Sequence, residues 1–409
     1  MVFFGNFGTQ NLGNEYTLQS IVHNARKYLP DAELTCICPD PEDVSARHKI
    51  PAIRMSYRYS KDFQSRMERR RNSPIARLSS RVARLPLELI EWAQAFKALR
   101  GAGVLVMPGT GMLGDFGISP LGLHYQILKW SIVAKLRHCK LFFVSVGAGP
   151  IAHPVSRWIV KRAASLADYR SYRDSFSREY LARIGFDTSR DFVYPDLAFS
   201  LTPRRVGSRR LQGHSRVIGL GLMDYYGQRM EHSELTYQSY LDKVTTFTAW
   251  LIEQKYIVRF LIGDVAYDRR IRRDVLGLLQ TRGIKYEGQI IDEPISSVEE
   301  VIEQLRATDI VVAIRFHSIV LALMLGKPVL AISYHKKIDS LMAALELVEY
   351  SQSVDQLDPS LLVQKFIKLE QSSESLKLLI RRKVHEYHRN LDKQYAHIFK
   401  DLSAESRSA

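Results

Sequence analysis

The fold is decided by the stretch Gly103-Val-Leu-Val-Met107, which runs directly into Pro108-Gly109-Thr110-Gly111-Met112-Leu113-Gly114-Asp115. The first five residues are apolar on both faces of an extended chain. A strand of this kind must be covered on both sides, as the parallel strands of α/β proteins are. The glycines that follow predict a strand-to-helix turn at the carboxyl end of the strand, where open α/β sheets bind their ligands.

The same alternation of short apolar runs, glycine or proline, and amphipathic stretches continues through the 409 residues. It predicts nine strands, at 2–4, 34–38, 103–107, 141–146, 192–194, 217–222, 256–262, 310–314 and 329–333. Helices are predicted between them, for example at 17–28, 87–100, 240–254 and 298–306. The pattern therefore predicts two doubly wound, Rossmann-like α/β domains facing a cleft.

The boundary between these domains is expected in the polar stretch 202–215, which contains proline and glycine and precedes a new strand. We expect an N-terminal α/β domain at 1–205 that carries the glycine-rich loops and the acceptor side. A C-terminal α/β domain is expected at 214–370, and a charged helical tail at 371–409.

The net charge of +15 is concentrated in three arginine-rich patches. Residues 66–84 carry a net +6, and the stretches 204–210 and 269–273 carry +4 each. Such patches favour a polyanion, an anionic membrane surface or an acidic substrate. The arginines lack the interleaved aromatic residues that stack on bases, and no known nucleic-acid-binding module is found, so we expect no nucleic-acid partner.

Compartment is indicated by the cysteines and by the apolar segments. The cysteines are too few for a disulfide framework, and Cys36 and Cys38 alternate within an apolar run, which is typical of buried strand residues in a reducing cytoplasm. The start of the chain lacks the features of a signal peptide, and the longest apolar run, about 319–326, is far shorter than a membrane span. We expect a cytoplasmic protein.

Several motifs follow predicted strands. The first is Gly5-Asn-Phe-Gly-Thr-Gln-Asn-Leu-Gly-Asn-Glu15, whose glycine spacing does not fit the dinucleotide-binding fingerprint. Gly147-Ala-Gly-Pro150 is a third glycine-rich turn, and Arg173-Asp174 begins a helix. Glycines allow a ligand close to the backbone, helix N-termini favour anions, and a guanidinium binds carboxylate or phosphate. Plain structural turns, a surface arginine and a helix cap remain the alternatives.

The strongest local signal is the buried run 310–314 followed by Arg315-Phe316-His317-Ser318. In an extended segment residues two apart point the same way, so Arg315 and His317 are expected to face one ligand. An imidazole moves protons near neutral pH, and the guanidinium holds an anion. The next strand exit, Tyr334-His-Lys-Lys337, adds cationic donors. No metal-binding motif, serine-hydrolase elbow or Walker A sequence is found, so an anionic small molecule is the expected ligand.

Taken in order, these motifs resemble the polysaccharide pyruvyl transferase family. The matching residues are Gly8-x-x-Asn11-x-Gly13-x-Glu15, Gly109-x-Gly111-x-x-x-Asp115, Gly147-x-Gly149-Pro150, Arg173-Asp174-x-x-Ser177, Asp196-x-x-Phe199, Arg315-x-His317, Gly326-x-Pro328 and Tyr334-x-x-Lys337. The family commonly has Gly-Asp-Glu where this chain has Gly13-Asn14-Glu15. If that carboxylate only caps a helix, Asn serves equally well; if it orients the acceptor, acceptor choice or activity is affected.

The resemblance implies a fold similar to the glycosyltransferase-B type. It implies transfer of the enolpyruvyl group of phosphoenolpyruvate, the donor, to sugar hydroxyls of a surface polysaccharide or its lipid-linked precursor, without a further cofactor or a metal. His317 and Arg315 are the expected catalytic residues. The expected substrate-binding residues are Asn11, Gly13, Glu15, Gly109, Thr110, Gly111, Asp115, Gly147, Gly149, Arg173, Asp174, Ser177, Tyr334 and Lys337.

Two other functions remain open. A nucleotide-sugar glycosyltransferase of the same architecture is the nearer one, and a basic nucleic-acid-binding protein is the more distant one. A location at the inner face of the cell membrane is also open. In residues 74–85, Ile75, Leu78, Val82 and Leu85 recur at near-helical spacing among Arg77, Arg81 and Arg84, as in a basic amphipathic helix that lies on an anionic membrane. The alternative is a helix packed on its own domain.

Overall fold

The computed structural model describes residues 1–57, 84–114, 118–201, 215–227, 233–262 and 268–406. The chain divides into two compact units. The first comprises Met1–Thr9, Thr17–Leu197 and Gln394–Ala409, and the second comprises Gln10–Tyr16 and Ala198–Lys393. The predicted junction at 202–215 lies almost entirely outside the described residues.

The first unit is built on a seven-stranded sheet with the order β3-β2-β1-β4-β5-β6-β7, in which every pairing is parallel. Its strands are β1 (Val2–Phe4), β2 (Thr35–Cys38), β3 (Ala52–Arg54), β4 (Val104–Leu113), β5 (Lys140–Ala148), β6 (Tyr169–Tyr172) and β7 (Phe192–Val193). The central strands are buried along nearly their whole length, as their apolar sequences require.

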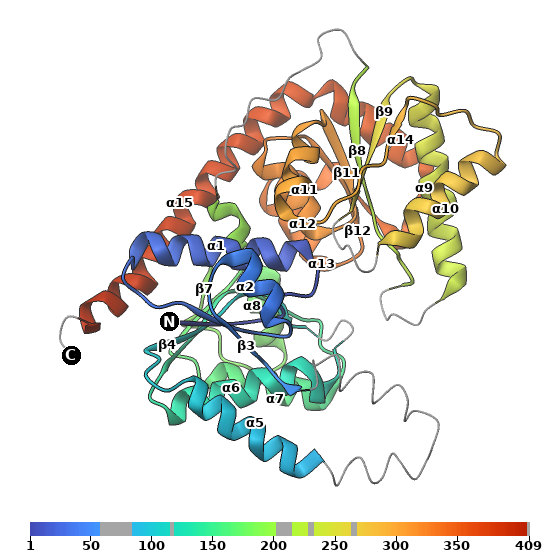
Figure 1. The fold of residues 1–409 in the computed structure, drawn as a ribbon. Helices are drawn as coiled ribbons and strands as arrows, with labels where there is room; N and C mark the ends of the chain where they lie inside the picture. Colours follow the sequence, from blue (N-terminus) through green and yellow to red (C-terminus); the bar gives the residue numbers. More distant parts are fainter. Residues whose placement is uncertain (58–83, 115–117, 202–214, 228–232, 263–267, 407–409) are drawn as a thin grey trace, which may run out of the picture. The chain divides into compact units, whose positions relative to one another are not determined.

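Helices follow the strands of the first unit in the alternation expected of a doubly wound sheet. They are α1 (Leu12–Tyr28), α2 (Pro41–His48), α5 (Arg84–Ala98), α6 (Tyr125–Leu136), α7 (Pro154–Ser165) and α8 (Ser175–Arg183). Figure 1 shows α5 and α6 on one side of this sheet and α1 on the other. A π-helical turn, Pro120–His124, leads into α6, and a 3₁₀ turn spans Leu197–Ser200.

The glycine-rich stretch after Met107 is not the turn that its sequence predicts, because the strand continues through it to Leu113. The parallel pairing with β5 persists, with Thr110 opposite Val146 and Leu113 opposite Ala148, and the register shifts between Thr110 and Leu113. At this irregularity Thr110 has a φ of 85°. A β-branched residue adopts the left-handed region only under strain, and such strain is characteristic of functional sites.

The second unit contains a six-stranded sheet with the order β10-β9-β8-β11-β12-β13, again with all pairings parallel. Its strands are β8 (Val217–Leu222), β9 (Ile257–Ile262), β10 (Ile290–Ile291), β11 (Ile310–Ala313), β12 (Val329–Ser333) and β13 (Ser351–Ser353). Its helices are α9 (Glu234–Glu253), α10 (Arg269–Thr281), α11 (Val298–Arg306), α12 (Phe316–Met324), α13 (Lys336–Ala344), α14 (Pro359–Gln371) and the long α15 (Ser373–Ser406). The predicted α/β architecture is confirmed.

The end of α15 belongs to the first unit because its side chains pack there. Gln394 is fully buried; its amide donates to Ser171 Oγ (2.7 Å) and accepts from Ser145 Oγ (3.0 Å). Tyr395 and Phe399 stack on each other, and both lie against Tyr28. None of the helices in the described ranges is both long and apolar enough to cross a lipid bilayer.

A buried charge cluster attaches α5 to the first unit. The Lys129 side chain on α6 has no solvent exposure, and its ammonium lies 2.6 Å from Glu91 and 3.4 Å from Glu88. Glu91 also accepts hydrogen bonds from Ser56 Oγ (2.7 Å) and from the N–H of Tyr57 (2.6 Å). A buried ammonium is tolerated only when it is paired in this way.

We expect Glu91→Ala to lower the free energy of unfolding by about 3 kcal/mol, because it removes the nearer partner of a buried ammonium. Urea denaturation would measure the change. The matched control is Glu42→Ala, which removes the partner of Arg54 in a pair where Glu42 is 80% exposed. That change should cost less than about 1 kcal/mol. Equal losses of unfolding free energy in the two variants would show that the buried pair of Glu91 and Lys129 does not stabilise the protein more than an exposed pair does.

Candidate functional site

In the second unit, candidate side chains gather at the carboxyl edge of the parallel sheet. β11 and β12 are neighbours, and each leads directly into a helix. Arg315 is the N-cap residue of α12 and His335 is the N-cap residue of α13. Two helix N-termini therefore lie at adjacent strand exits, a geometry that favours anions.

The Arg315 guanidinium is held by a carboxylate that the sequence analysis did not identify. Its Nε and Nη2 donate to the two oxygens of Asp268, at 2.9 and 2.5 Å. Asp268 is fully buried at the start of α10, whereas the Arg315 side chain is 21% exposed. Residues 263–267, between β9 and Asp268, lie outside the described residues. The only signal in the sequence is an aspartate just before a helix, which also fits an ordinary cap.

His317 lies in the first turn of α12 and not in an extended segment, so the predicted reason for its alignment with Arg315 is wrong. Instead, its position is set by the first turn of α1. Residues 10–16, which include this turn, group with the second unit, whereas the rest of α1 groups with the first. A Cβ atom on Gly13 would lie 1.9 Å from Nδ1 of His317. The imidazole thus packs directly on the backbone of Gly13, in space that only glycine leaves open.

Three other polar residues of this motif, Asn11, Asn14 and Glu15, lie at the start of α1. The side chain of Asn11 accepts from the N–H of Asn14 at 3.3 Å, so Asn11 caps α1. Position 14, where the related family commonly has Asp, therefore lies inside the helix. Glu15 is fully buried in the next position. The second half of the first glycine-rich motif, residues 10–15, and the Arg315-x-His317 motif, some 300 residues apart, belong to one unit.

Lys337 and Tyr334 lie beside the start of α12. The Lys337 ammonium is 5.6 Å from the ring centroid of Phe316 and 5.1 Å from that of Tyr334. The N–H of Lys337 donates to Nδ1 of His335 at 3.1 Å, which fixes the first turn of α13. The structure therefore brings Arg315, His317, Tyr334 and Lys337 to one edge of one sheet.

The remaining candidates lie in the first unit, around Arg173. This residue follows β6, and its side chain is only 5% exposed. It donates to Asp196 at 3.3 Å and forms an ion pair with Asp174 at 3.6 Å. A Cβ atom on Gly147 would lie 2.5 Å from Nη2 of Arg173, and one on Gly111 would lie 3.6 Å from the same atom. The guanidinium therefore lies against two of the glycine-rich segments.

Asp174 and Ser177 have a clear structural role. Asp174 caps α8 by accepting from the N–H of Ser177 at 2.7 Å, and Ser177 Oγ accepts from the N–H of Ala148 at 3.0 Å. Gly149, next to it, donates to the carbonyl of Leu113 at 2.9 Å. These bonds join the start of α8 to the ends of β4 and β5. Gly109 and Thr110 lie in β4, and Asp115 lies outside the described residues.

In the basic patch at 269–273, the three arginines whose side chains are described all form ion pairs. Arg270 pairs with Glu234 and Asp274, Arg272 with Asp292, and Arg273 with Asp274. Its charge is thus offset locally. The patch at 204–210 and nearly all of that at 66–84 lie outside the described residues. Within the described ranges, no three His, Cys, Asp or Glu side chains are grouped so that they could hold a metal ion.

Comparison with known proteins identifies both a family and a fold. A family model for polysaccharide pyruvyl transferase matches residues 11–336. No curated protein matches the chain. A UDP-GlcNAc 2-epimerase from Neisseria meningitidis bound to UDP-GlcNAc is 11% identical, with a TM-score of 0.57 over 96% of this chain and 100% of that one. A glycosyltransferase from Rickettsia africae is 13% identical, with a TM-score of 0.59 over 98% and 97%. At these identities the likeness concerns the glycosyltransferase-B fold alone.

We expect Gly147→Ala to lower the free energy of unfolding by about 1–3 kcal/mol, because the new methyl group would displace the buried Arg173 guanidinium. Thermal or urea denaturation would measure this. Gly277→Ala in α10 is the matched control, because a Cβ atom there meets nothing within 4 Å. It should stabilise the protein by up to about 1 kcal/mol. A similar loss of unfolding free energy in both variants would show that the contact with Arg173 is not the cause.

Proposed function

The chain belongs to the polysaccharide pyruvyl transferase family and is thus a transferase, and from this premise we propose its reaction. It transfers the enolpyruvyl group of phosphoenolpyruvate to two hydroxyls of a sugar in a polysaccharide or its lipid-linked precursor. The donor's methylene carbon gains a proton and becomes a methyl group. Each hydroxyl loses its proton, the carbon–oxygen bond to phosphate breaks, and the products are a pyruvate ketal and inorganic phosphate.

The placement of Arg315 and His317 at the start of α12 carries this proposal. Phosphoenolpyruvate presents a phosphate and a carboxylate, so its site needs several cationic or N–H donors. Arg315, Lys337 and the first turn of α12 supply such donors at one sheet edge. We assign Arg315 to the donor's anionic groups, where a guanidinium also stabilises charge on the departing phosphate.

We assign proton transfer to His317. The reaction needs a group that gives a proton to carbon and accepts protons from hydroxyls, and an imidazole does both near neutral pH. The packing of its ring against Gly13 holds it in one orientation. Precise orientation is what general acid–base catalysis requires of such a group.

The first unit supplies the other proposed binding residues. Arg173 is oriented by Asp196 and lies against the glycine-rich segments around Gly111 and Gly147. Its guanidinium is suited to a carboxylate or phosphate oxygen, and exposed backbone at Gly111 allows a ligand to approach closely. We propose that Gly109, Thr110 and Gly149 also take part in substrate binding, as does Asp115, which lies outside the described residues.

We expect His317→Ala to lower the rate of phosphate release from phosphoenolpyruvate plus acceptor glycan by about 100-fold or more, the usual contribution of a general acid–base. A coupled phosphate assay would measure it. His385→Ala, an exposed histidine on α15, is the matched control and should leave the rate unchanged. Normal phosphate release by the His317 variant would disprove its role.

The choice of donor is tested separately, because proteins with this fold include enzymes bound to nucleotide-sugars. A ligand that binds the folded state raises the melting temperature. We expect phosphoenolpyruvate to raise it and UDP-sugars to leave it unchanged. The reverse result would favour a nucleotide-sugar glycosyltransferase.

We also propose that the enzyme works in the cytoplasm, at the inner face of the cell membrane, where a lipid-linked acceptor is located. Three buried free cysteines accord with a reducing compartment. On α5, Leu89 is 72% exposed and Ile90 is 52% exposed, and Leu87 lies nearby. The arginine-rich stretch 66–84 leads directly into this helix in the sequence. Exposed apolar side chains on a helix that follows an arginine-rich stretch in the sequence suit an anionic lipid surface.

We expect Leu89→Asp to weaken binding to vesicles that contain anionic phospholipid by at least about tenfold, because burial of one leucine contributes about 1.5–3 kcal/mol. Vesicle co-sedimentation would measure it, together with charge reversal at Arg77, Arg81 and Arg84. Leu378→Asp is the matched control, since that leucine on α15 is 68% exposed. Binding that none of these changes affects would exclude the membrane location.

A further inference from the structure

Three neighbouring strand exits of the second unit converge on one carboxylate, that of Asp268. The strands β9, β8 and β11 lie side by side in the sheet. Asp224 follows β8, Asp268 stands at the start of α10 in the connection after β9, and Arg315 follows β11. The Asp268 side chain has no solvent exposure. A carboxylate so deeply buried needs several donors.

These donors come from both flanking exits. Besides the two bonds from Arg315, Asp268 accepts from the backbone N–H of Asp224 at 3.2 Å. The Asp224 carboxylate in turn accepts from the N–H of Ile271 at 2.9 Å, in the first turn of α10. Burial raises the pKa of the Asp224 carboxyl above its ordinary value. The loop after β8 and the start of α10 are thus tied together around Asp268.

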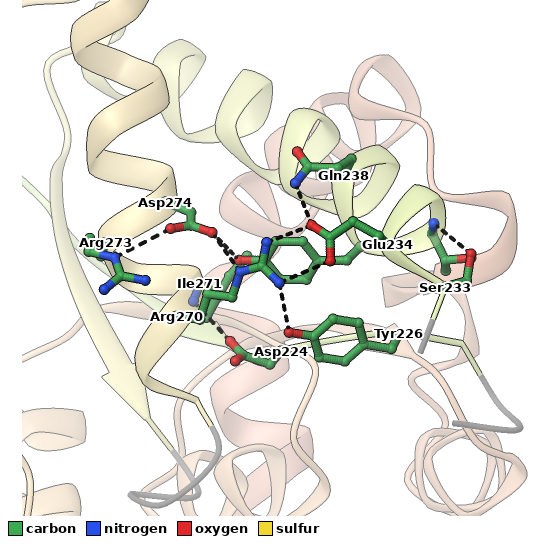
Figure 2. Close-up of polar contacts among 11 residues, drawn as sticks. Asp224, Tyr226, Ser233, Glu234, Gln238, Arg270, Ile271, Arg273 and Asp274 are labelled. Atoms are coloured by element: carbon green, nitrogen blue, oxygen red, sulfur yellow. Dashed lines mark hydrogen bonds and ion pairs between the residues drawn. The ribbon is translucent and has the colours of Figure 1, made fainter. Parts of the chain in front are cut away.

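A second layer, centred on Arg270, holds this arrangement in place (Figure 2). Its guanidinium donates to both oxygens of Glu234 (2.5 and 3.0 Å) at the start of α9, to Asp274 (3.1 Å) and to Tyr226 (3.1 Å). It also lies 4.1 Å from the ring centroid of Tyr237. Because Tyr226 and Asp224 are in one loop, Arg270 links that loop to both α9 and α10.

We propose that Asp268 is a positioning residue, which holds the Arg315 guanidinium in the one plane that presents it to the donor's anionic groups. This inference rests on the proposed function. Asp268 engages the Nε and Nη2 edge of a planar group, so the direction of the opposite Nη1 edge is fixed. Partners of this kind orient the group that touches the substrate, and their loss typically lowers activity about 10- to 100-fold at metal sites.

The net charge of the Arg315–Asp268 pair supports a positioning role for Asp268. It argues against Arg315 binding the anion through its charge alone. Asp268 offsets the guanidinium charge, so the pair contributes directed N–H groups and little net charge. Lys337 and the N-terminus of α12 then supply the positive potential that attracts the donor. Arg315 contributes hydrogen bonds to the donor, and the direction of these bonds depends on Asp268.

A double-mutant cycle tests the proposal on the full chain. We expect Asp268→Asn to lower kcat/KM for phosphoenolpyruvate about 10- to 100-fold and to raise KM, because the amide keeps the shape and loses the paired acceptors. In the Arg315→Ala background the same change should have little further effect. Asp224→Asn is the matched control, since its amide oxygen still accepts from Ile271, and it should leave kcat/KM within about threefold of wild type. Additive losses in the cycle would overturn the proposal.

A second measurement needs no turnover. Phenylglyoxal modifies arginine side chains, and mass spectrometry of the peptide containing Arg315 gives the rate at that residue. We expect modification of Arg315 to be severalfold faster in Asp268→Asn than in wild type, and unchanged in Asp224→Asn. An unchanged rate in Asp268→Asn would overturn the positioning role. If the wild-type protein releases no phosphate from phosphoenolpyruvate while Arg315 still becomes more reactive, the proposed function fails and the positioning role stands.

Discussion

Parallel pairing of every strand in the second sheet is the constraint on which its candidate site depends. It puts the carboxyl ends of β8, β9, β11 and β12 at one edge, so residues far apart in sequence meet there without any motif joining them. Arg315, Asp268 and Lys337 come from three different connections and share that edge. The site is thus a property of the sheet, and the helices that begin there add their N–H groups to it.

Much of this could be predicted from the sequence, for a simple reason. Eight of the nine predicted strands end within two residues of their predicted ends, because buried parallel strands are uniformly apolar and are bounded by glycine, proline or polar residues. The ninth, β4, extends well beyond its prediction through Pro108 to Leu113. The glycines of this segment favour a turn by their intrinsic propensity. The segment nevertheless stays extended because it pairs with β5 as far as Leu113. The sequence does not predict the short strands β3, β6, β10 and β13. Each has at most four residues, too few to show a recognisable apolar pattern.

The sequence indicates which side chains are candidates for the site, but not which contacts hold them in place. The sequence singles out Arg315 and His317 as candidates because a cationic and an imidazole group follow a buried strand directly. Their alignment was explained wrongly, since His317 is helical and Gly13 determines where its ring lies. Asp268 could not be found, because an aspartate before a helix looks like an ordinary cap, and the pairing of Asp196 with Arg173 could not be predicted from its place in a turn. Only tertiary contacts distinguish a cap from a carboxylate that holds a buried guanidinium.

Position 14 shows how such contacts change the meaning of a substitution. Asn and Asp are nearly equivalent as helix caps, so a departure from the family's usual Asp would be of little consequence at a cap. In this chain Asn11 is the residue that caps α1, and Asn14 lies in the first turn of the helix, next in sequence to Gly13, on whose backbone His317 packs. An acidic side chain in the first turn of a helix interacts favourably with the helix dipole, so Asn at position 14 removes that contribution from the turn whose Gly13 backbone contacts His317.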